Sequence, residues 1–444
     1  MNLRHFVAWA QEQEELLVVD SALNPHLEMA RAMHALDGRP VLFNALTGHP
    51  NWRALSGVCA RREHFAVALG CRASDLVHRM AEALANPAPP ALTSGEALCQ
   101  EVAADRVDLT HLPIPRYHAR DGGRYVTSGI AVIEDPDYGR NVAFHRLMIL
   151  DARRVAARIV ENRGTHTAWA KTDRDVPVAI AIGCPIQVLL AAAMSPPKGV
   201  DELAIAQAMA PTPLAACQTV DLAVPAEAEI ILEGRITHTL ADEGPFPDLT
   251  ETMDVVRRQP VIEIDRFTHR RAPIFHALLP GGMEHKHLMG MPREPTIFAA
   301  VDEVCRCTGV YITPGGASWL HVVVQIEKQH DDDGQKAIEA AFRGHSSLKH
   351  VVIVDTDIDI YDSTDVEWAI ATRFQADRDL RVFTDQPSSS LDPSATQIPG
   401  EKSRTAKMGL DATAPLNAAR KAYQKVEYEA LDLSQYNLKR GTTV

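Results

Sequence analysis

Hydrophobic positions recur at helical spacing in the first quarter of the chain, over Leu27–Leu36, Arg62–Leu69 and Ala73–Ala85. After the first of these segments, the short apolar run Pro40–Phe43 predicts a buried strand. Helices that alternate with short strands are typical of an α/β unit. We therefore expect an N-terminal α/β domain over residues 1–118.

The pattern changes to many short strands between residues 119 and 300. Two helical segments, Pro185–Met194 and Asp201–Met209, interrupt these strands. The expected strands are 124–133, 141–150, 177–183, 217–223, 229–239 and 261–266. This mixture favours a β-barrel or β-sandwich with inserted helices.

Alternation of helices and strands returns in the C-terminal part of the chain. The expected helices are Thr296–Cys305, Gln335–Phe342 and Val366–Arg373, and the expected strands are Trp319–Ile326 and Val351–Val354. They predict a separate α/β domain over residues 301–444. Within it, Gln386–Gly400 is rich in Ser and Pro and predicts an exposed loop. Pro415–Tyr428 predicts a final helix before a polar tail, and we expect this tail to dock on another subunit.

Composition and charge narrow the classes of function. With 444 residues and 46% hydrophobic content, the chain is expected to form a multi-domain α+β protein with a large core. Its net charge of −13 argues against nucleic acids and anionic membranes as broad partners. No apolar run reaches membrane-spanning length, and the first residues lack the pattern of a signal peptide, which favours a cytoplasmic protein. The seven scattered cysteines are expected to be free thiols.

An arginine in an apolar strand is the first candidate for chemistry. Asp121–Leu150 has the pattern of a hairpin, and Arg146 falls in its second strand. A buried guanidinium needs an anionic partner, which is either a structural carboxylate or part of a functional site. Asn141 precedes Arg146 by an odd number of positions, so a regular strand would point the two side chains to opposite faces. Both reach one site only if a bulge or bend intervenes.

Two further stretches supply carboxylates. Glu243 and Asp248 flank the rigid segment Gly-Pro-Phe-Pro, which is either an acidic surface turn or a loop that delivers an acid pair to Arg146. An arginine between two carboxylates can keep one of them ionised while the other stays available for proton transfer. Glu202 lies in the first turn of an expected helix, where the helix dipole favours a carboxylate for structural reasons alone.

Five motifs follow one another in a fixed order along the chain. They are Gly123-Arg-Tyr-Val-Thr-Ser-Gly129, Asp135-Pro-Asp with Arg140-Asn141 and Arg146, Val220-Asp-Leu-x-Val-Pro225 leading to Leu232-Glu-Gly234, Glu243-Gly-Pro-Phe-x-Asp248, and Lys407-Met-Gly-Leu-Asp-Ala-Thr413. Each motif alone is weakly specific, but chance does not account for their order over roughly 300 residues. In these motifs the chain resembles the UbiD family of non-oxidative decarboxylases, which use prenylated FMN. The resemblance implies carboxy-lyase activity and a central split β-barrel that binds the flavin.

The resemblance also implies a metal centre. Asn141 and Glu202 would bind a divalent ion, Mn²⁺ or Mg²⁺, that bridges to the cofactor phosphate. Oxygen-rich ligands suit such hard ions. The third ligand is placed at His166, while Glu161 or Asn162 are the alternatives. A mixed set of imidazole and carboxylate suits manganese better than calcium.

The same resemblance assigns roles to the acid–arginine–acid group. Arg146, Glu243 and Asp248 would form the catalytic centre, with Asp248 as the proton donor to the carbon that loses CO₂. Cofactor contacts are implied for Asn141, Arg146, Met194 and Lys407. A K⁺ ion is expected near the carbonyls of Ala191–Met194. Implied partners are a flavin prenyltransferase as cofactor supplier and further copies of the chain, in a homodimer or homohexamer.

The substrate is approached through one basic stretch. His285 and Arg293 lie among several basic residues of an acidic protein. They are either solvated charges or a binding site for a second polar or anionic group of the substrate. The second interpretation favours a furan or pyrrole carboxylate or dicarboxylate among aromatic, heteroaromatic and α,β-unsaturated acids. The rival functions are an FMN-dependent oxidoreductase and a non-catalytic flavin-binding assembly protein.

Overall fold

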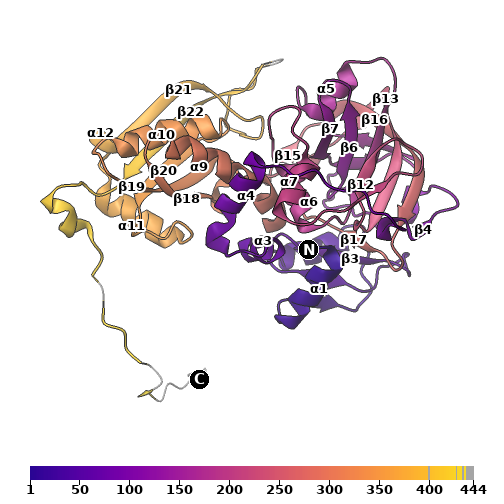
Figure 1. Ribbon diagram of the computed structural model, residues 1–444, viewed down its shortest axis with the longest axis horizontal. Helices are drawn as coiled ribbons and strands as arrows, with labels where there is room; N and C mark the ends of the chain where they lie inside the picture. Colours follow the sequence, from indigo (N-terminus) through magenta and orange to yellow (C-terminus); the bar gives the residue numbers. More distant parts are fainter. Residues whose placement is uncertain (399–400, 427, 433–434, 437–444) are drawn as a thin grey trace.

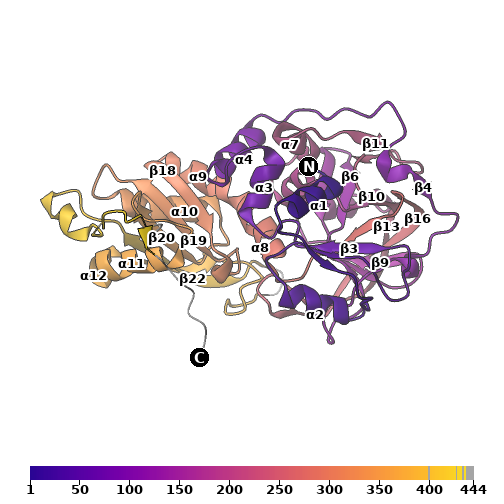
Figure 2. The same ribbon diagram turned by 90° about the horizontal axis from the view of Figure 1, so that it is seen from below.

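The computed structural model describes residues 1–398, 401–426, 428–432 and 435–436. Residues from helix α9 (Glu294–Asp302) onward form one lobe, and the N-terminal and central residues form the other (Figure 1). Helices α3 (Arg62–Leu69) and α4 (Leu76–Ala85) lie where the lobes meet, as the turned view in Figure 2 also shows. The expected multi-domain α+β class is confirmed.

The N-terminal part forms a small mixed sheet with helices packed around it. Its strand order is β1 (Leu17–Val19), β2 (Val41–Phe43), β3 (Arg53–Ser56) and β17 (Ile274–His276), and its other helices are α1 (Leu3–Glu12) and α2 (Glu28–Ala35). Short 3₁₀ helices cover Ala73–Asp75 (η1), Leu98–Gln100 (η2) and Leu109–His111 (η3). The expected helices are present. Because β17 comes from far along the chain, the N-terminal sheet is tied to the central region, and the domain limits at 118 and 300 stay predictions.

A nine-stranded sheet dominates the central region. Its strand order is β5 (Tyr125–Val126), β8 (Leu147–Ile149), β9 (Arg154–Ala157), β16 (Arg257–His269), β13 (Ile230–Glu243), β10 (Val176–Ile182), β6 (Ile130–Asp135) and β7 (Gly139–Phe144), while β4 (Val102–Ala103) pairs with β16. Helices α6 (Ile186–Ala193) and α7 (Glu202–Met209) pack on one face through Ala179 and Ala181. The alternate residues Val178 and Ile180 enter a second core on the other face. Period-two alternation along β10 therefore separates the two cores.

Two residues of chain connect distant parts of this sheet. Strand β7 lies at one end of the strand order and β8 lies next to the other end, yet only His145 and Arg146 separate them. The backbone N–H of His145 donates to Gly129 O at 3.0 Å, and that of Arg158 donates to Arg146 O at 3.0 Å. The sheet must therefore curl until its ends approach each other. Among the described strands the ladder is an open path and not a closed barrel.

One expected strand was wrong. Residues 217–223 form a turn between β11 (Leu214–Ala216) and β12 (Ala223–Pro225). The buried Glu233 carboxylate accepts hydrogen bonds from the backbone of Gln218 at 2.9 Å and of Thr219 at 2.6 Å. A carboxylate that binds consecutive N–H groups takes the place of a strand partner, so the local β-preference is overridden.

The C-terminal lobe is an α/β layer, as expected. Its strand order is β18 (Arg306–Ile312), β19 (His321–Glu327), β20 (His350–Asp355), β22 (Arg404–Ala412) and β21 (Leu380–Pro387), and its helices are α9, α10 (Asp333–Gly344), α11 (Ser363–Arg373) and α12 (Ala376–Asp379), with a 3₁₀ turn at Pro314–Gly316 (η5). Strands β19, β20 and β22 run parallel. Residues 399 and 400 of the expected Ser/Pro-rich loop lie outside the described residues.

The expected helix at 415–428 was largely wrong. Only the 3₁₀ segment η6 (Ala418–Tyr423) forms, and residues 424–426 and 428 are not helical. Arg420 anchors the segment through an ion pair with Asp355 at 3.0 Å, and beyond it the chain leaves the lobe (Figure 1). A short helix without a packing partner is marginal in water, which explains the difference. Residue 427 lies outside the described residues.

Two global expectations were also tested. All seven cysteines are free, as predicted. In the described part of the chain, no helix has both the length and the apolar character needed to cross a membrane.

Candidate active site

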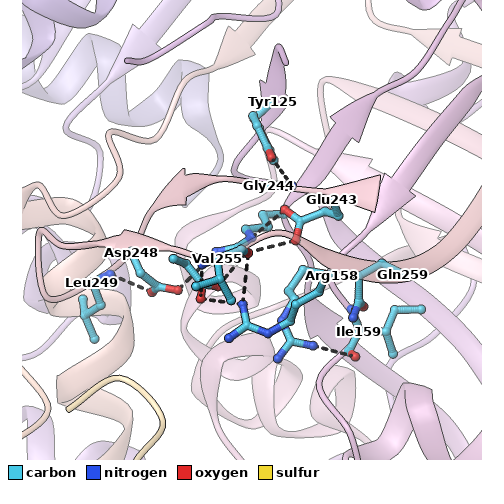
Figure 3. Close-up of polar contacts among 12 residues, drawn as sticks. Tyr125, Arg158, Ile159, Glu243, Gly244, Asp248, Leu249, Val255 and Gln259 are labelled. Carbon is cyan, nitrogen blue, oxygen red and sulfur yellow. Dashed lines mark hydrogen bonds and ion pairs between the residues drawn. The ribbon is translucent and has the colours of Figure 1, made fainter. Parts of the chain in front are cut away.

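The site begins with the long antiparallel pair β13–β16. Glu243 ends β13 and lies opposite Arg257, the first residue of β16. The connection between them contains a small ribbon, β14 (Phe246–Pro247) and β15 (Met253–Asp254), in which Phe246 faces Asp254. The ribbon brings the connecting carboxylates back toward Arg146 at the curled end of the sheet. Figure 3 shows Glu243 and Asp248 at the two sides of this connection, with their polar contacts as dashed lines.

Arg146 binds three carboxylates. Its Nε and Nη2 donate to the two oxygens of Glu243 at 2.9 and 3.0 Å. Its Nη1 donates to Asp248 Oδ2 at 3.1 Å, and Nη2 also donates to Asp254 Oδ2 at 2.8 Å. The structure thus brings together the three residues that the sequence placed in one group. The bend expected between Asn141 and Arg146 is the break between β7 and β8.

Electrostatics and packing fix this guanidinium. Burial works against the charge of Arg146, but hydrogen bonds and attraction from Glu243, Asp248 and Asp254 outweigh it and raise the pKa of the guanidinium. Its central carbon lies 5.4 Å from the ring centre of Phe246. That ring lies 4.0 Å from the ring of Tyr125, whose hydroxyl accepts from the N–H of Gly244 at 3.1 Å.

Sequence reasoning missed Asp254 and Arg257. Asp254 forms ion pairs with both Arg146 and Arg257. The available signal was the spacing of these two residues just before a long strand, where the chain returns from the Glu243–Asp248 loop. A hairpin places residues at similar distances from the turn opposite each other, so Arg257 could have been paired with Glu243.

His285 lies beside this group. It is in the first turns of α8 (Met283–Gly290), and its Nδ1 accepts from the N–H of Gly281 at 3.0 Å, which leaves the proton of the neutral ring on Nε2. Burial lowers the pKa of His285, and the negative charge of Asp248 partly offsets this effect. The neighbouring Lys286 is occupied by an ion pair with Glu251.

The expected metal ligands lie near the start of α7 and α5 (Gly164–Ala170). Glu202 Oε2 accepts from the backbone N–H of Val142 at 2.9 Å, so this carboxylate lies next to Asn141. Asn141 Nδ2 donates to Thr165 Oγ1 at 3.2 Å. His166 lies in the same helix as Thr165, with its ring centre 5.8 Å from that of Trp169. Within the described residues no group of three or more His, Cys, Asp or Glu forms a metal site, and the expected set contains only two residues of these types.

Two observations bear on whether Glu202 and Asn141 could hold a cation. Burial raises the pKa of Glu202 to about 7, since the hydrogen bond from Val142 compensates its charge only in part. A bound cation would offset that cost. Asn141 Oδ1 also occupies the place that a Cβ at Gly164 would take, at 1.8 Å, so only glycine leaves room for the amide oxygen. Glu161, an alternative ligand, is instead exposed and paired with Arg158 at 3.2 Å.

A second, partly buried arginine has different surroundings. Arg293 ends the 3₁₀ turn η4 (Met291–Arg293) and donates through Nη2 to Ser195 Oγ at 2.7 Å and to Ala193 O at 3.4 Å. Its guanidinium carbon lies 5.4 Å from the ring centre of Trp319. Among the described residues no carboxylate lies within ion-pair distance of it, and its Nε has no partner. Burial and the nearby Arg163 lower the pKa of Arg293 to about 10.

Further basic groups lie near Arg293, and we call Arg163, Arg293 and Lys407, which surround the neutral imidazole of His345, the cationic cluster. Burial, Arg293 and Lys407 lower the pKa of His345 to about 3. Burial lowers the pKa of Lys407 to about 8, and its Nζ donates to Ser346 O at 2.6 Å. Met194 is buried at the end of α6, next to the carbonyl that Arg293 contacts. His285 and Arg293 share no contact, so the structure gives the two expected substrate residues separate surroundings.

Sequence comparison relates most of this chain to one enzyme family. Residues 7–84, 91–283 and 286–412 match the N-terminal, Rift-related and C-terminal domains of 3-octaprenyl-4-hydroxybenzoate carboxy-lyase, respectively. An anhydromevalonate phosphate decarboxylase of Methanothermobacter thermautotrophicus is 42% identical, over 93% of this chain and 97% of that protein.

Comparison with solved structures leads to the same family. The UbiD-class enzyme HmfF of Pelotomaculum thermopropionicum in complex with FMN has a TM-score of 0.93 and 35% identity, covering 98% of this chain and 100% of that one. An evolved dimeric form of HmfF in complex with prFMN has a TM-score of 0.89 and 34% identity, covering 98% and 99%. The fold and the three matched domains are thus those of a carboxy-lyase, and the chain belongs to the UbiD family. It is a UbiD-class decarboxylase.

Proposed function

We propose that this decarboxylase uses prenylated FMN and acts on an α,β-unsaturated carboxylic acid that carries a second anionic group. The observation that carries the proposal is the bonding of Arg146, which holds Glu243 through two hydrogen bonds and Asp248 through one. The complexes of HmfF with FMN and prFMN support the cofactor. Neither the oxidoreductase nor the non-catalytic alternative is supported by the family.

Prenylated FMN, when bound, supplies the electron sink for the loss of CO₂. Glu243 fixes the plane of the Arg146 guanidinium, because a bidentate pair restrains both position and orientation. Asp248, held by a single hydrogen bond from Arg146, donates its proton to the carbon that has lost CO₂ and afterwards regains one from water. His285, beside Asp248, helps to orient the substrate next to that proton.

The metal and cofactor contacts that we propose are those implied by the family resemblance. Asn141, Glu202 and His166 would hold Mn²⁺ or Mg²⁺, and the carbonyls of Ala191–Met194 would hold K⁺. Lys407 would contact the cofactor phosphate. Calorimetric titration with Mn²⁺ tests the divalent site: we expect binding to the wild type and its loss in E202Q. Equal affinity of both proteins for Mn²⁺ would show that Glu202 is not a ligand and that the ion binds elsewhere.

The second anionic group is inferred from Arg293. A buried arginine without a carboxylate partner suits a phosphate or carboxylate of a ligand. The relative that is 42% identical is named for anhydromevalonate phosphate, a dehydrated mevalonate that bears a phosphate. We therefore favour a phosphate-bearing unsaturated acid of this class, and this choice replaces the furan or pyrrole acids that the sequence favoured.

The decisive experiment is production together with a flavin prenyltransferase, followed by measurement of CO₂ release. The panel contains anhydromevalonate phosphate, its dephosphorylated form, a furan dicarboxylate and a cinnamate. We expect release from the first, and a strong rise in KM when the phosphate is missing. D248N should lose turnover by at least about 100-fold while it still binds the flavin.

The matched control is D242N. Asp242 is an exposed aspartate of β13, next to Glu243, and it pairs with Arg258 at 3.3 Å outside the Arg146 cluster. Its substitution should leave CO₂ release unchanged. Wild-type turnover in D248N would remove the proton-donor role, and no CO₂ release from any acid would overturn the proposed function.

We further propose a homodimer or homohexamer in which the C-terminal tail contacts a second copy. The described tail exposes Val426 and Leu431, which is unusual for solvated chain. Light scattering of the full chain and of a chain ending at residue 415 tests this assignment. Unchanged mass after truncation would assign the assembly to another surface.

A further inference from the structure

The loop that carries Asp248 also places a second charged pair, Asp254 and Arg257, at the site. In the β14–β15 ribbon Asp254 lies opposite Phe246, and at the strand ends Arg257 lies opposite Glu243. The residues on the return path are therefore held in register with those on the outward path. Asp254 and Arg257 belong to the frame of the site and not to a mobile surface turn.

Asp254 is the most strongly ion-paired of these side chains. Its Oδ2 accepts from Arg146 Nη2 at 2.8 Å, and its Oδ1 pairs with Arg257 Nη1. Burial opposes the ionisation of Asp254, but Arg257 and Arg146 outweigh this effect and lower its pKa. Asp254 therefore carries a negative charge throughout the neutral range.

The charges in this cluster do not balance. Two guanidiniums, Arg146 and Arg257, face three carboxylates, so full ionisation leaves one excess negative charge and one bound proton removes it. Glu243 is bidentate and fully buried, and Asp254 has two guanidinium partners. Asp248 has one guanidinium partner and the most exposed side chain of the three, at 22% against 0% and 16%.

We propose that Asp254 and Arg257 are positioning residues that set this charge balance, so that the one proton retained by the cluster resides on Asp248. The inference rests on the proposed function, in which Asp248 gives its proton to carbon. Without Asp254, the charge of Arg146 would be free to hold Asp248 as an anion. Without Arg257, the excess negative charge would hold the proton more firmly.

Other groups face Asp248, and all of them are unchanged by these substitutions. From α8 they are His285 and Lys286, the latter paired with Glu251 of the same loop. The backbone N–H of Leu249 also donates to Asp248 Oδ1 at 2.6 Å. The titration of His285 depends on the charges of Asp248 and Arg146, so the carboxyl signal of Asp248 is followed directly to separate the two titrations.

The test compares D254N and R257Q through the alkaline midpoint of the pH profile of kcat. We expect the midpoint to fall by about one pH unit in D254N and to rise by a similar amount in R257Q. A purely structural role would lower kcat at every pH and would not move the two midpoints in opposite directions. The side chain of Arg257 is 28% exposed, so R257Q is expected to fold even if D254N does not.

Asp242 of β13 and Arg258 of β16 provide matched controls next to this cluster. They form the adjacent cross-strand pair, and their side chains are 68% and 62% exposed. D242N and R258Q make the same charge changes without contact to Arg146 and should leave the midpoint in place. A shift in these controls as large as in D254N and R257Q would show a general effect of net charge and would overturn the proposal.

A second readout does not depend on turnover. In cofactor-free protein with ¹³C-labelled aspartate, the carboxyl signal of Asp248, assigned through D248N, should titrate at lower pH in D254N and at higher pH in R257Q. An unmoved midpoint in R257Q by both readouts overturns the charge-balance proposal. Failure of the proposed function is distinguishable, because it appears as no CO₂ release by the wild type or as full activity of D248N.

Discussion

Arg146 and Arg293 are both partly buried arginines, and their partners differ completely. Arg146 meets three carboxylates, and their attraction raises the pKa of its guanidinium above the ordinary value. Arg293 meets a hydroxyl, a carbonyl and an indole ring, and burial lowers its pKa to about 10. Burial alone therefore does not define the role of a buried charge, because the partners decide it.

The difference separates two functions. A guanidinium neutralised by the protein's own carboxylates has no remaining attraction for a ligand anion, but it can control where a proton is held. A guanidinium left without carboxylates carries a desolvation cost that a ligand anion would relieve. The first arrangement suits proton transfer to carbon, and the second suits recognition of a phosphate. Three substitutions test this division, in order of decreasing effect.

The largest effect is expected for R146Q. It leaves the fully buried Glu243 without its bidentate partner, and breaking a buried ion pair costs about 3–5 kcal/mol. We expect a free energy of unfolding lower by that amount and CO₂ release reduced by at least about 1,000-fold, because the proton donor also loses its support. Urea unfolding and turnover measure the two effects.

R146K serves as the control for charge alone. Lysine keeps the positive charge but lacks the planar fork that binds Glu243 at two points, so we expect recovery of part of the stability and little of the activity. A loss of stability below about 1 kcal/mol in R146Q would show that the three carboxylates do not depend on this arginine.

The carboxylate partners of Arg146 were largely predictable from the sequence. Arg146 in an apolar run requires acids, and the prolines around Phe246 indicate a rigid loop that presents Glu243 and Asp248. Asp254 was not predictable, because its contact with Arg146 depends on the register of the β14–β15 ribbon. Register comes from tertiary pairing, which the local pattern does not contain.

The surroundings of Arg293 were less predictable. Arg293 was expected to act together with His285, yet the two occupy separate surroundings, because a 3₁₀ turn follows α8 and directs Arg293 toward the end of α6. Two expected elements failed for a similar reason. The strand at 217–223 gives way to a turn bound by the distant Glu233, and within the expected helix at 415–428 only the 3₁₀ segment Ala418–Tyr423 forms, where Arg420 pairs with the distant Asp355.

R293Q should have the opposite stability effect to R146Q. Because the wild-type guanidinium has no carboxylate partner among the described residues, its removal relieves a desolvation cost, so we expect stability to be unchanged or raised by up to about 1 kcal/mol. Inorganic phosphate should raise the Tm of the wild type but not of R293Q. R306Q, which removes an exposed arginine paired with Glu327, is the matched control and should keep the phosphate response. A destabilisation as large as that of R146Q would abolish the distinction between the two arginines.

The smallest effect is a pH dependence of stability that comes from Lys407. Burial lowers its folded-state pKa to about 8 from 10.5, so between these values the unfolded chain binds more protons than the folded protein. Stability must therefore rise with pH across this window, by about 1 kcal/mol between about pH 7.5 and about pH 9. Urea unfolding at the two pH values should show this rise in the wild type and its absence in K407M, whereas K336M, which removes an exposed lysine paired with Asp332, should retain it. A rise that persists in K407M would mean that the cationic cluster carries no desolvation cost at this position, and the contrast with Arg146 would then rest on Arg293 alone.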